Sequence, residues 1–448
     1  MKKMPLIMIA MLGCLLPGLM TASMADSESS ETEARIQRRA VVDDLMMVAI
    51  SQNPEIQSAR EKWRAVVETY RIETAYPDPQ LMVTYFPDPI ETRIGPQDWN
   101  AALSQGIPFP GKLSKMGDMV EAEARMARLT LDKTVRDVVV SVRESFYELL
   151  YIQKARDVAE QQIKLLDHLR KIAETAYAAD RAAFIDVVKT QSQAGQLRYD
   201  VLLLTDLEET EIAKLNSLLN RPPDAEIGPL ESIALQPVAV TLAEIYRLAE
   251  KNQEEIRMME AQIQKADAGL SLARYQYLPN FKVGLFYAGI GDPDVMAPPR
   301  DAGDDALGVQ FGVTIPLWPG KNKGRVEKAK AELAASQAAK SARINDSFAH
   351  IRATYFRLQN AARIIGLYEK DLLPQAAKSM SLAETWFQEG ESSFSDFVET
   401  QSVWYNFQLA LVRAQADYGK YLARLERLAG QSLTGADLSE RTDRKEAK

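Results

Sequence analysis

The sequence predicts a mainly α-helical protein with a small membrane β part, built from two similar halves. Three observations predict this fold. Long charged, alanine-rich stretches repeat apolar residues every three or four positions, which is the spacing of one helix face. Four short segments alternate apolar residues with small or polar ones, as strands with a single apolar face do. The same segments recur in the same order about two hundred residues apart, which indicates an internal duplication.

The beginning of the chain has the pattern of an export signal. Lys2 and Lys3 precede an apolar run, and a small-residue cleavage site follows that ends at Ala25. Cys14, the single cysteine, offers a second reading in which it becomes a lipidated N-terminus. The apolar run continues beyond Cys14, which favours cleavage after Ala25. The mature chain would then contain no cysteine, and no disulfide could stabilise it.

Three pairs of segments define the duplication. AISQNPEI at 49–56 matches AEKNQEEI at 249–256, and the register holds as far as Phe86 and Phe286. IPFPGK at 107–112 matches IPLWPGK at 315–321, and FIDVVKTQS at 184–192 matches FSDFVETQS at 394–402. These matches divide the chain into a signal peptide (1–25), an N-terminal extension (26–39), a first repeat (40–232), a second repeat (233–432) and a polar C-terminal tail (433–448).

Each repeat contains the same predicted elements. A helix comes first, at about 40–76 and 241–277, and Asn53-Pro54 has the pattern of an N-cap followed by the first helical residue. Two strands follow, at about 81–87 and 98–107 in the first repeat and 280–288 and 306–315 in the second. A very long helix begins after each Pro-Gly segment; the first has no proline or glycine between Gly117 and Tyr177. A return helix completes each repeat, at about 184–220 and 394–430.

The pattern of the predicted strands indicates that they lie in a membrane. In ALGVQFGVTI at 306–315, an apolar residue occupies every second position, and the intervening residues are small or polar. Such segments approach the roughly 9–11 residues that a tilted membrane strand needs. The alternative is a pair of hairpins in a soluble sandwich, but long helices separate the hairpins and leave no obvious second sheet. Four strands cannot close a barrel, and lipid does not tolerate open edges, so the chain is expected to be an obligate oligomer.

Other classes of function have little support in the sequence. The formal net charge of −8 argues against a nucleic-acid partner. His168 and His350 are the only histidines, and both lie in predicted helices without a second metal ligand nearby. Several methionines lie in the first segment, and those of MVEAEARMA and IRMMEA lie at helical spacing, which is typical of packing. Neither a glycine-rich phosphate loop nor a nucleophile elbow is present. We therefore expect no enzyme activity, no cofactor and no metal site.

The duplicated order of helix, two strands, long helix, turn and return helix resembles the TolC-type outer-membrane efflux family over roughly 40–430. The resemblance implies a homotrimer in which twelve strands share one β-barrel in the outer membrane and the helices form an α-barrel tunnel in the periplasm. It places the paired Pro-Gly segments where barrel becomes tunnel. Proline would end each strand and glycine would let the chain turn into the helix. These junction residues are Pro108, Pro110 and Gly111, and Pro316, Pro319 and Gly320.

The resemblance also implies two functional regions at the far helical ends. Acidic residues at the positions of Asp396 and Glu399 ring the closed tunnel mouth in the family, and Asp186 is the counterpart of Asp396 in the first repeat. Lys189 replaces the second acid there. An arginine that helps to lock the family's best-known member falls on Ser392 here, so that lock is absent or built differently. The helical tips would contact an adaptor; the candidate residues are Asp180, Arg181, Gly390, Glu391 and Ser392.

The function implied is an exit duct of a tripartite efflux pump. Its partners would be a periplasmic adaptor, an inner-membrane pump of the RND or ABC type, and outer-membrane lipid. The PFPGKL segment resembles members that work with metal-cation pumps, so small solutes or metal cations are the expected cargo. A type I protein-secretion duct is one alternative. A soluble periplasmic coiled-coil scaffold or adaptor is an alternative of a different class.

Overall fold

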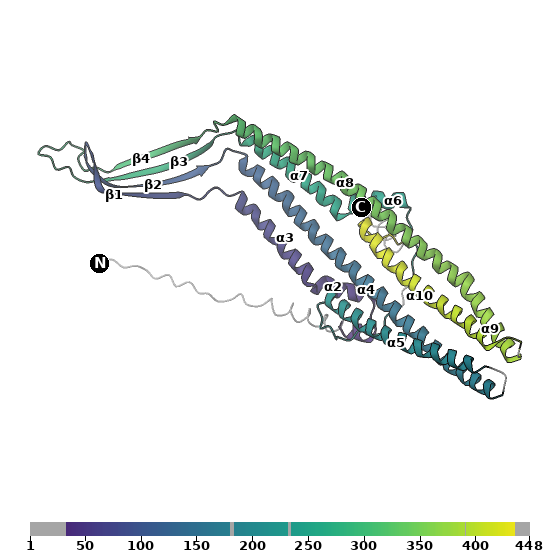
Figure 1. Ribbon diagram of the computed structural model, residues 1–448. Helices are drawn as coiled ribbons and strands as arrows, with labels where there is room; N and C mark the ends of the chain where they lie inside the picture. Colours follow the sequence, from purple (N-terminus) through teal and green to yellow (C-terminus); the bar gives the residue numbers. More distant parts are fainter. Residues whose placement is uncertain (1–32, 180–182, 232–233, 390, 435–448) are drawn as a thin grey trace, which may run out of the picture.

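The protein is an elongated molecule with a sheet at one end and helical tips at the other (Figure 1). The computed structural model describes residues 33–179, 183–231, 234–389 and 391–434. The mainly helical fold with four strands is confirmed. The expected signal peptide with Cys14, and most of the polar tail, lie outside the described residues. The boundaries of the two repeats stay a prediction, although the same element order occurs twice along the chain.

One four-stranded antiparallel sheet contains every predicted strand. The strands follow one another in the order β1 (Gln80–Thr92), β2 (Gly95–Ile107), β3 (Asn280–Ile290) and β4 (Ala306–Thr314). β1 is longer than predicted and continues through a register shift to Thr92. The two outermost strands, β1 and β4, each have one edge without a partner among the described residues.

The predicted strand alternation is confirmed, and it gives the sheet one apolar face. Across the four strands, Leu81 pairs with Leu103, Leu103 with Leu285, and Leu285 with Val309. Because strand residues two apart share a face, this face also carries the neighbouring apolar positions. These side chains are exposed; Phe311 reaches 80 %. An exposed apolar surface of this kind is typical of contact with lipid.

The helices run from the sheet to the tips in two antiparallel hairpins. The first repeat contains α2 (Val42–Gln52), α3 (Pro54–Glu73), α4 (Lys112–Ala178) and α5 (Phe184–Leu218). The second contains α6 (Leu242–Asn252), α7 (Glu254–Tyr275), α8 (Pro319–Leu367), α9 (Leu373–Glu389) and α10 (Phe394–Ala429). α4 has 67 residues, so the very long uninterrupted helix predicted for the first repeat is confirmed.

Each predicted first helix is in fact two helices, and single helices over 40–76 and 241–277 were wrong. The chain breaks at Asn53, where Pro54 cannot continue the preceding hydrogen-bond ladder. The Asn53 side chain accepts from the backbone N–H groups of Glu55 and Ile56, as an N-cap does. Its Nδ2 also donates to the carbonyl of Leu218, 2.9 Å away, which joins the start of α3 to the end of α5.

The second long helix differs from its predicted form at two places. It begins at Pro319, so Gly320 lies inside α8 and does not form the turn expected of it. Further along, a π-helical turn from Tyr368 to Leu372 separates α8 from α9. Pro374, just beyond this turn, has no N–H to offer the preceding carbonyls, which accounts for the change in helical register.

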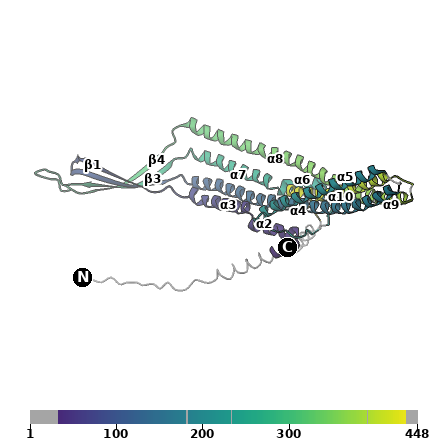
Figure 2. The same cartoon turned by 60° about the horizontal axis from the view of Figure 1, so that its bottom comes forward.

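The described residues form three separate apolar clusters along the molecule. Two clusters lie midway along the helices. In one, α2 packs against α4 on the outer side of the long helices (Figure 2), and in the other α6 packs against α8 and α10. The third joins the two hairpins near their tips. Among the described residues, no helix is both long and apolar enough to span a membrane.

Candidate functional site

The two helical tips lie together at the end of the molecule opposite the sheet (Figure 1). A shared apolar cluster holds them, with Leu169 of α4, Val187 of α5 and Phe397 of α10 among its buried members. Aromatic rings strengthen this contact, since the Phe387 ring lies 5.3 Å from that of Phe394. At the surface, the Lys189 ammonium donates to the Ser395 hydroxyl at 3.3 Å and links α5 to α10.

Asp396 begins α10 and has a structural task of its own. Its carboxylate accepts from the Ser393 N–H at 3.3 Å, and the Ser393 hydroxyl accepts from the Asp396 N–H at 3.2 Å. This reciprocal pair is a capping box, which satisfies two otherwise unpaired donors. A negative charge also interacts favourably with the helix N-terminus. Any loss of the Asp396 carboxylate therefore affects helix stability as well as surface charge.

The other two candidate gate acids differ in their surroundings. Glu399 is exposed one turn beyond Asp396. Asp186 is half-buried in the first turn of α5. Both repeats keep the same local pattern: the carbonyls of Asp186 and Asp396 accept from the threonine hydroxyls four residues later. The chain thus places acids from both repeats at one end of the molecule, and their role as a gate stays a prediction.

The expected adaptor-contact residues are only partly described. Asp180, Arg181 and Gly390 lie outside the described residues. Glu391 is exposed, and its N–H donates to the Trp386 carbonyl at 2.8 Å. Ser392 is half-buried, and within the described part of the chain its hydroxyl has no hydrogen-bond partner. A serine with an unpaired hydroxyl cannot form the ion-pair lock that an arginine would provide.

The sequence did not point to a set of ion pairs that fastens α10 to α4. Arg427 is its centre, with a side chain only 12 % exposed. Its guanidinium donates to Asp137 of α4 at 2.6 Å and, at 2.9 Å, to Glu255 of α7. Other pairs follow along the same two helices: Arg143 with Glu426, Arg424 with Glu144, and Lys420 with Glu148. Only the folded structure brings together residues so distant in sequence.

Three carboxyl groups in this cluster have pKa values that differ from their usual values. Burial raises the pKa of the Asp137 carboxyl, but hydrogen bonds from Arg427 and Lys133 outweigh it and hold the pKa below its usual value. For Glu255, burial again opposes, and the bond from Arg427 again lowers the net pKa. Glu254 behaves differently, because its burial exceeds the effect of Arg136 and raises its pKa. One oxygen of Glu254 has no hydrogen-bond partner among the described residues.

A second contact that the sequence did not predict holds the first strand-to-helix junction. Lys112, the first residue of α4, is 5 % exposed. Its ammonium donates to the Leu278 carbonyl at 2.7 Å and to Oδ1 of Asn280, the first residue of β3, at 2.8 Å. Gly111 has φ 95° and lies against Tyr275, whose ring would be 2.6 Å from an added Cβ. The lysine after each Pro-Gly pair was the available sequence signal for this contact.

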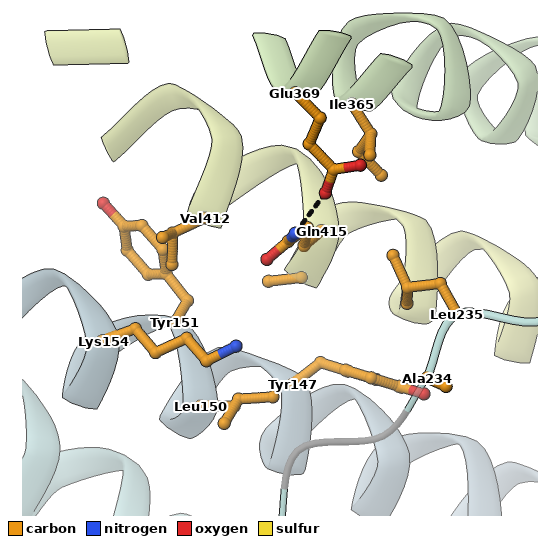
Figure 3. Close-up of a pocket in the computed structure, with 11 residues that line it drawn as sticks. Tyr147, Leu150, Tyr151, Lys154, Ala234, Leu235, Ile365, Glu369, Val412 and Gln415 are labelled. Atoms are coloured by element: carbon orange, nitrogen blue, oxygen red, sulfur yellow. Dashed lines mark hydrogen bonds between the residues drawn. The ribbon is translucent and has the colours of Figure 1, made fainter. Parts of the chain in front are cut away.

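A cavity of about 400 Å³ lies beside the π turn, between α4, α10 and the segment that joins the repeats (Figure 3). Lys154 points toward it from α4, and Gln415 donates to Glu369 at 2.9 Å on the opposite side. Tyrosine and aliphatic side chains line most of the remainder. In the described part of the chain, no three His, Cys, Asp or Glu side chains gather in a way that could hold a metal ion.

The long helical hairpins and the open-edged sheet together define the class of outer-membrane channels. Similarity to known proteins agrees with this. The sequence model of the family described as "Outer membrane efflux protein" matches residues 245–431. This match lies within the second repeat, and it agrees with the resemblance of the chain to the TolC-type outer membrane efflux protein family, which is a family of channels and not of enzymes. This similarity argues against the alternative of a soluble periplasmic scaffold.

Individual relatives are distant. The chain is 19 % identical over 390 residues to nodulation protein T of Rhizobium leguminosarum bv. trifolii, covering 84 % of this chain and 82 % of that protein. It is 22 % identical over 312 residues to the pyoverdine export outer membrane protein OpmQ of Pseudomonas aeruginosa, covering 66 % and 62 %. The solved structure of CusC shares the fold with a TM-score of 0.74 at 14 % identity, over 87 % of this chain and 92 % of that chain.

Proposed function

We propose that this outer membrane efflux channel is the exit duct of a tripartite pump that passes small solutes or metal cations out of the periplasm. The observation that carries the proposal is the sheet, which has one exposed apolar face and two edges unpaired in the chain. Such a sheet is stable in lipid only when copies of the chain close it into a barrel. The helices then continue the barrel as a tunnel.

The homotrimer follows from four strands per chain and the twelve-stranded barrel that the family resemblance implies. In this trimer, the sheet lies in the outer membrane and the helices reach into the periplasm. The tips, at the far end, are the part that an inner-membrane pump and its adaptor can reach. Exposed tip residues such as Glu391 are suited to such a contact, because connecting segments on a rigid scaffold commonly carry binding residues.

The acids near the tips support a cation-attracting mouth. Three copies of Asp396 and Glu399 would line one narrow opening, where low-dielectric walls strengthen their field. Asp186 would add to this charge, and Lys189 would partly offset it. Export of a small solute is preferred over protein secretion, because one relative is named for export of pyoverdine.

The test is to reconstitute the purified protein in a planar lipid bilayer and to measure single-channel conductance. A duct predicts discrete conductance steps with a preference for cations. In cell envelopes, the protein should remain in the sarkosyl-insoluble outer-membrane fraction as an oligomer that dissociates on heating. Absence of conductance from correctly assembled oligomers would contradict the duct.

A further inference from the structure

The junction between β2 and α4 makes a contact within the chain. The corresponding junction of the second repeat, between β4 and α8, does not make this contact. After β2 ends, Lys112 reaches across to the segment that precedes β3 and bonds the Leu278 carbonyl and Asn280. The ring of Phe109 also stacks on that of Phe281, with centroids 6.3 Å apart. The end of the first hairpin thus packs against the beginning of the second hairpin and is hydrogen-bonded to it.

The duplication identifies the counterparts of both sides of this contact. The shared Pro-Gly-Lys makes Lys321 the counterpart of Lys112. The shared register of Pro79 and Pro279 makes Asp78 and Gln80 the counterparts of Leu278 and Asn280. In the chain, these two surfaces cannot meet, because Lys321 follows β4 and Asp78 precedes β1, at opposite edges of the sheet.

Burial shows that both counterpart surfaces lack the contact. Residues 107–109 are half-buried and Lys112 is buried, whereas Ile315, Leu317, Trp318 and Lys321 are all exposed. On the other side, residues 75–83 are exposed throughout, whereas five of the six residues 275–280 are half-buried, the exception being Tyr277. At the second junction, an apolar surface and Lys321 are therefore exposed and contact no segment like 275–280. The segment before β1, which corresponds to 275–280, is likewise exposed and has no junction packed on it.

Strand register gives an independent check. Ile107 pairs with Phe281 in the observed sheet, so the same arrangement between copies would pair Ile315 with Leu81. The antiparallel ladder would then oppose Val313 to Val83 and Phe311 to Tyr85. All of these side chains lie on the exposed apolar face, so the register continues that face across the joint. If the register between the two strands shifted by one residue, the apolar side chains of one strand would lie on the opposite face of the sheet from those of the other.

We propose that the Pro-Gly-Lys junction of the second repeat docks on the segment before β1 of an adjacent copy, with Lys321 bonded to Asp78 and Gln80 there. The Asp78 carboxylate adds a charge partner that Leu278 does not provide. The second junction has one extra residue, which places Lys321 two positions further into its helix than Lys112. The counterpart of Tyr275 is Ala75, so this junction meets a smaller side chain and needs no left-handed glycine.

This inference rests on the proposed oligomeric duct, and one experiment separates the two. The detergent-purified protein is treated with a carbodiimide, which joins an ammonium to a carboxylate that touches it, and is then digested for mass spectrometry. The expected product is a Lys321–Asp78 peptide, together with covalent oligomers on a denaturing gel. Because these residues lie at opposite edges of the sheet in one chain, the peptide can only come from two copies.

Matched variants sharpen the result. Lys321→Gln should remove that peptide and lower the temperature at which the oligomer dissociates. Lys323→Gln, at an exposed lysine two positions on, should change neither. Lys321→Asp combined with Asp78→Lys should restore both the cross-link and the dissociation temperature. An oligomer by native mass spectrometry that lacks the peptide and is indifferent to Lys321→Gln overturns the inference and leaves the duct intact. A protein that is monomeric overturns both.

Discussion

Two glycines with the same neighbours show how context acts at a single residue. Gly111 and Gly320 both follow proline and precede lysine, but only Gly111 has a positive φ, of 95°. Tyr275 packs against Gly111, whereas no atom approaches within 4 Å of a Cβ added to Gly320. A left-handed backbone is strained for any residue with a Cβ. The two positions therefore form a matched pair for mutation.

Gly111→Ala should destabilise the protein by at least about 1–2 kcal/mol, because the strain of the left-handed backbone adds to the overlap with Tyr275. Gly320→Ala should be neutral or stabilise by up to about 1 kcal/mol, since alanine is the better helix former. The measurement is the temperature of thermal dissociation of each variant in detergent. If both substitutions lowered the dissociation temperature equally, the two junctions would have more similar backbone conformations than the structure shows.

At the tips, the charge of the gate acids can be tested without removing the helix cap. Asp396→Asn with Glu399→Gln keeps hydrogen-bond acceptors and removes the negative charge. In a planar bilayer, the double variant should lose cation selectivity and resist block by a trivalent cation added from the tip side. Ser393→Ala, which breaks the capping box and keeps both acids, should retain selectivity. If the double variant behaves as the parent does, the narrowest point lies elsewhere.

Among the elements, the sheet shows the sharpest contrast between its two faces. β4 presents Val309 and Phe311 on the apolar face and Gln310 on the other. This alternation follows from the two-residue repeat of a strand and makes the faces chemically distinct.

Val309→Arg or Phe311→Arg should block membrane assembly, because an arginine on the lipid face near the midplane costs about 2–4 kcal/mol per chain. Gln310→Arg should assemble normally. The readout is the amount of heat-sensitive oligomer in outer-membrane fractions. Loss of assembly with Gln310→Arg alone would mean that the face assigned to lipid is the wrong one.

Between helices, the Arg427 cluster predicts a dependence on pH. Asp137 and Glu255 have lowered pKa values in the folded protein, so their contribution to stability is complete above the ordinary carboxyl range, where the usual values are 3.8 and 4.5. It is lost as pH falls through the lower folded values. Glu254 acts in the opposite sense, because its raised pKa makes protonation favour the folded state.

Arg427→Gln should therefore destabilise the protein at neutral pH by roughly 1–3 kcal/mol, since it removes the nearest partner of the buried Glu255 carboxylate and one of two partners of the more exposed Asp137. The loss should shrink as pH falls below the usual carboxyl pKa values of 3.8 and 4.5, since the parent then loses these pairs as well. Thermal dissociation measured from pH 7 to pH 3 tests both points. Arg64→Gln, which removes an exposed pair with Glu61, is the control and should cost less than about 1 kcal/mol at every pH.

The whole molecule has a shape that one copy cannot complete. The sheet has two open edges, and the long helices form a wall and not a compact core. Open sheet edges in lipid leave backbone groups without partners, which costs several kcal/mol for each group.

Native mass spectrometry of the detergent-solubilised protein should give a trimer as the main species. Dilution should not release a folded monomer, because folding and assembly are one process when the monomer cannot satisfy its edges. The circular dichroism of any monomeric fraction should show loss of strand signal. A folded monomer as the main species would contradict the proposal that several copies share one barrel.

Much of the fold was determined by the sequence alone, because its signals are local and periodic. The spacing of apolar residues identified α4, and the alternation of apolar with small or polar residues, which is clear in β3 and β4 and weaker in β2, identified the sheet and its apolar face. The duplication could be read directly, since it depends only on matching letters. The N-cap at Asn53 was also recognisable, because proline and a side-chain acceptor act within a few residues.

Only the tertiary structure decided where helices break without a local signal and which distant charges meet. Gln253 ends a helix without a proline, and the Ser347 hydroxyl donates to its side chain across the bundle. Arg427 lies far in sequence from Asp137, and Lys112 from Asn280. The same Pro-Gly-Lys letters gave a left-handed turn at Gly111 and a helix at Gly320, because only the first packs against another segment of its own chain. Side-chain contacts between distant segments depend on the packed arrangement, and no periodicity records them.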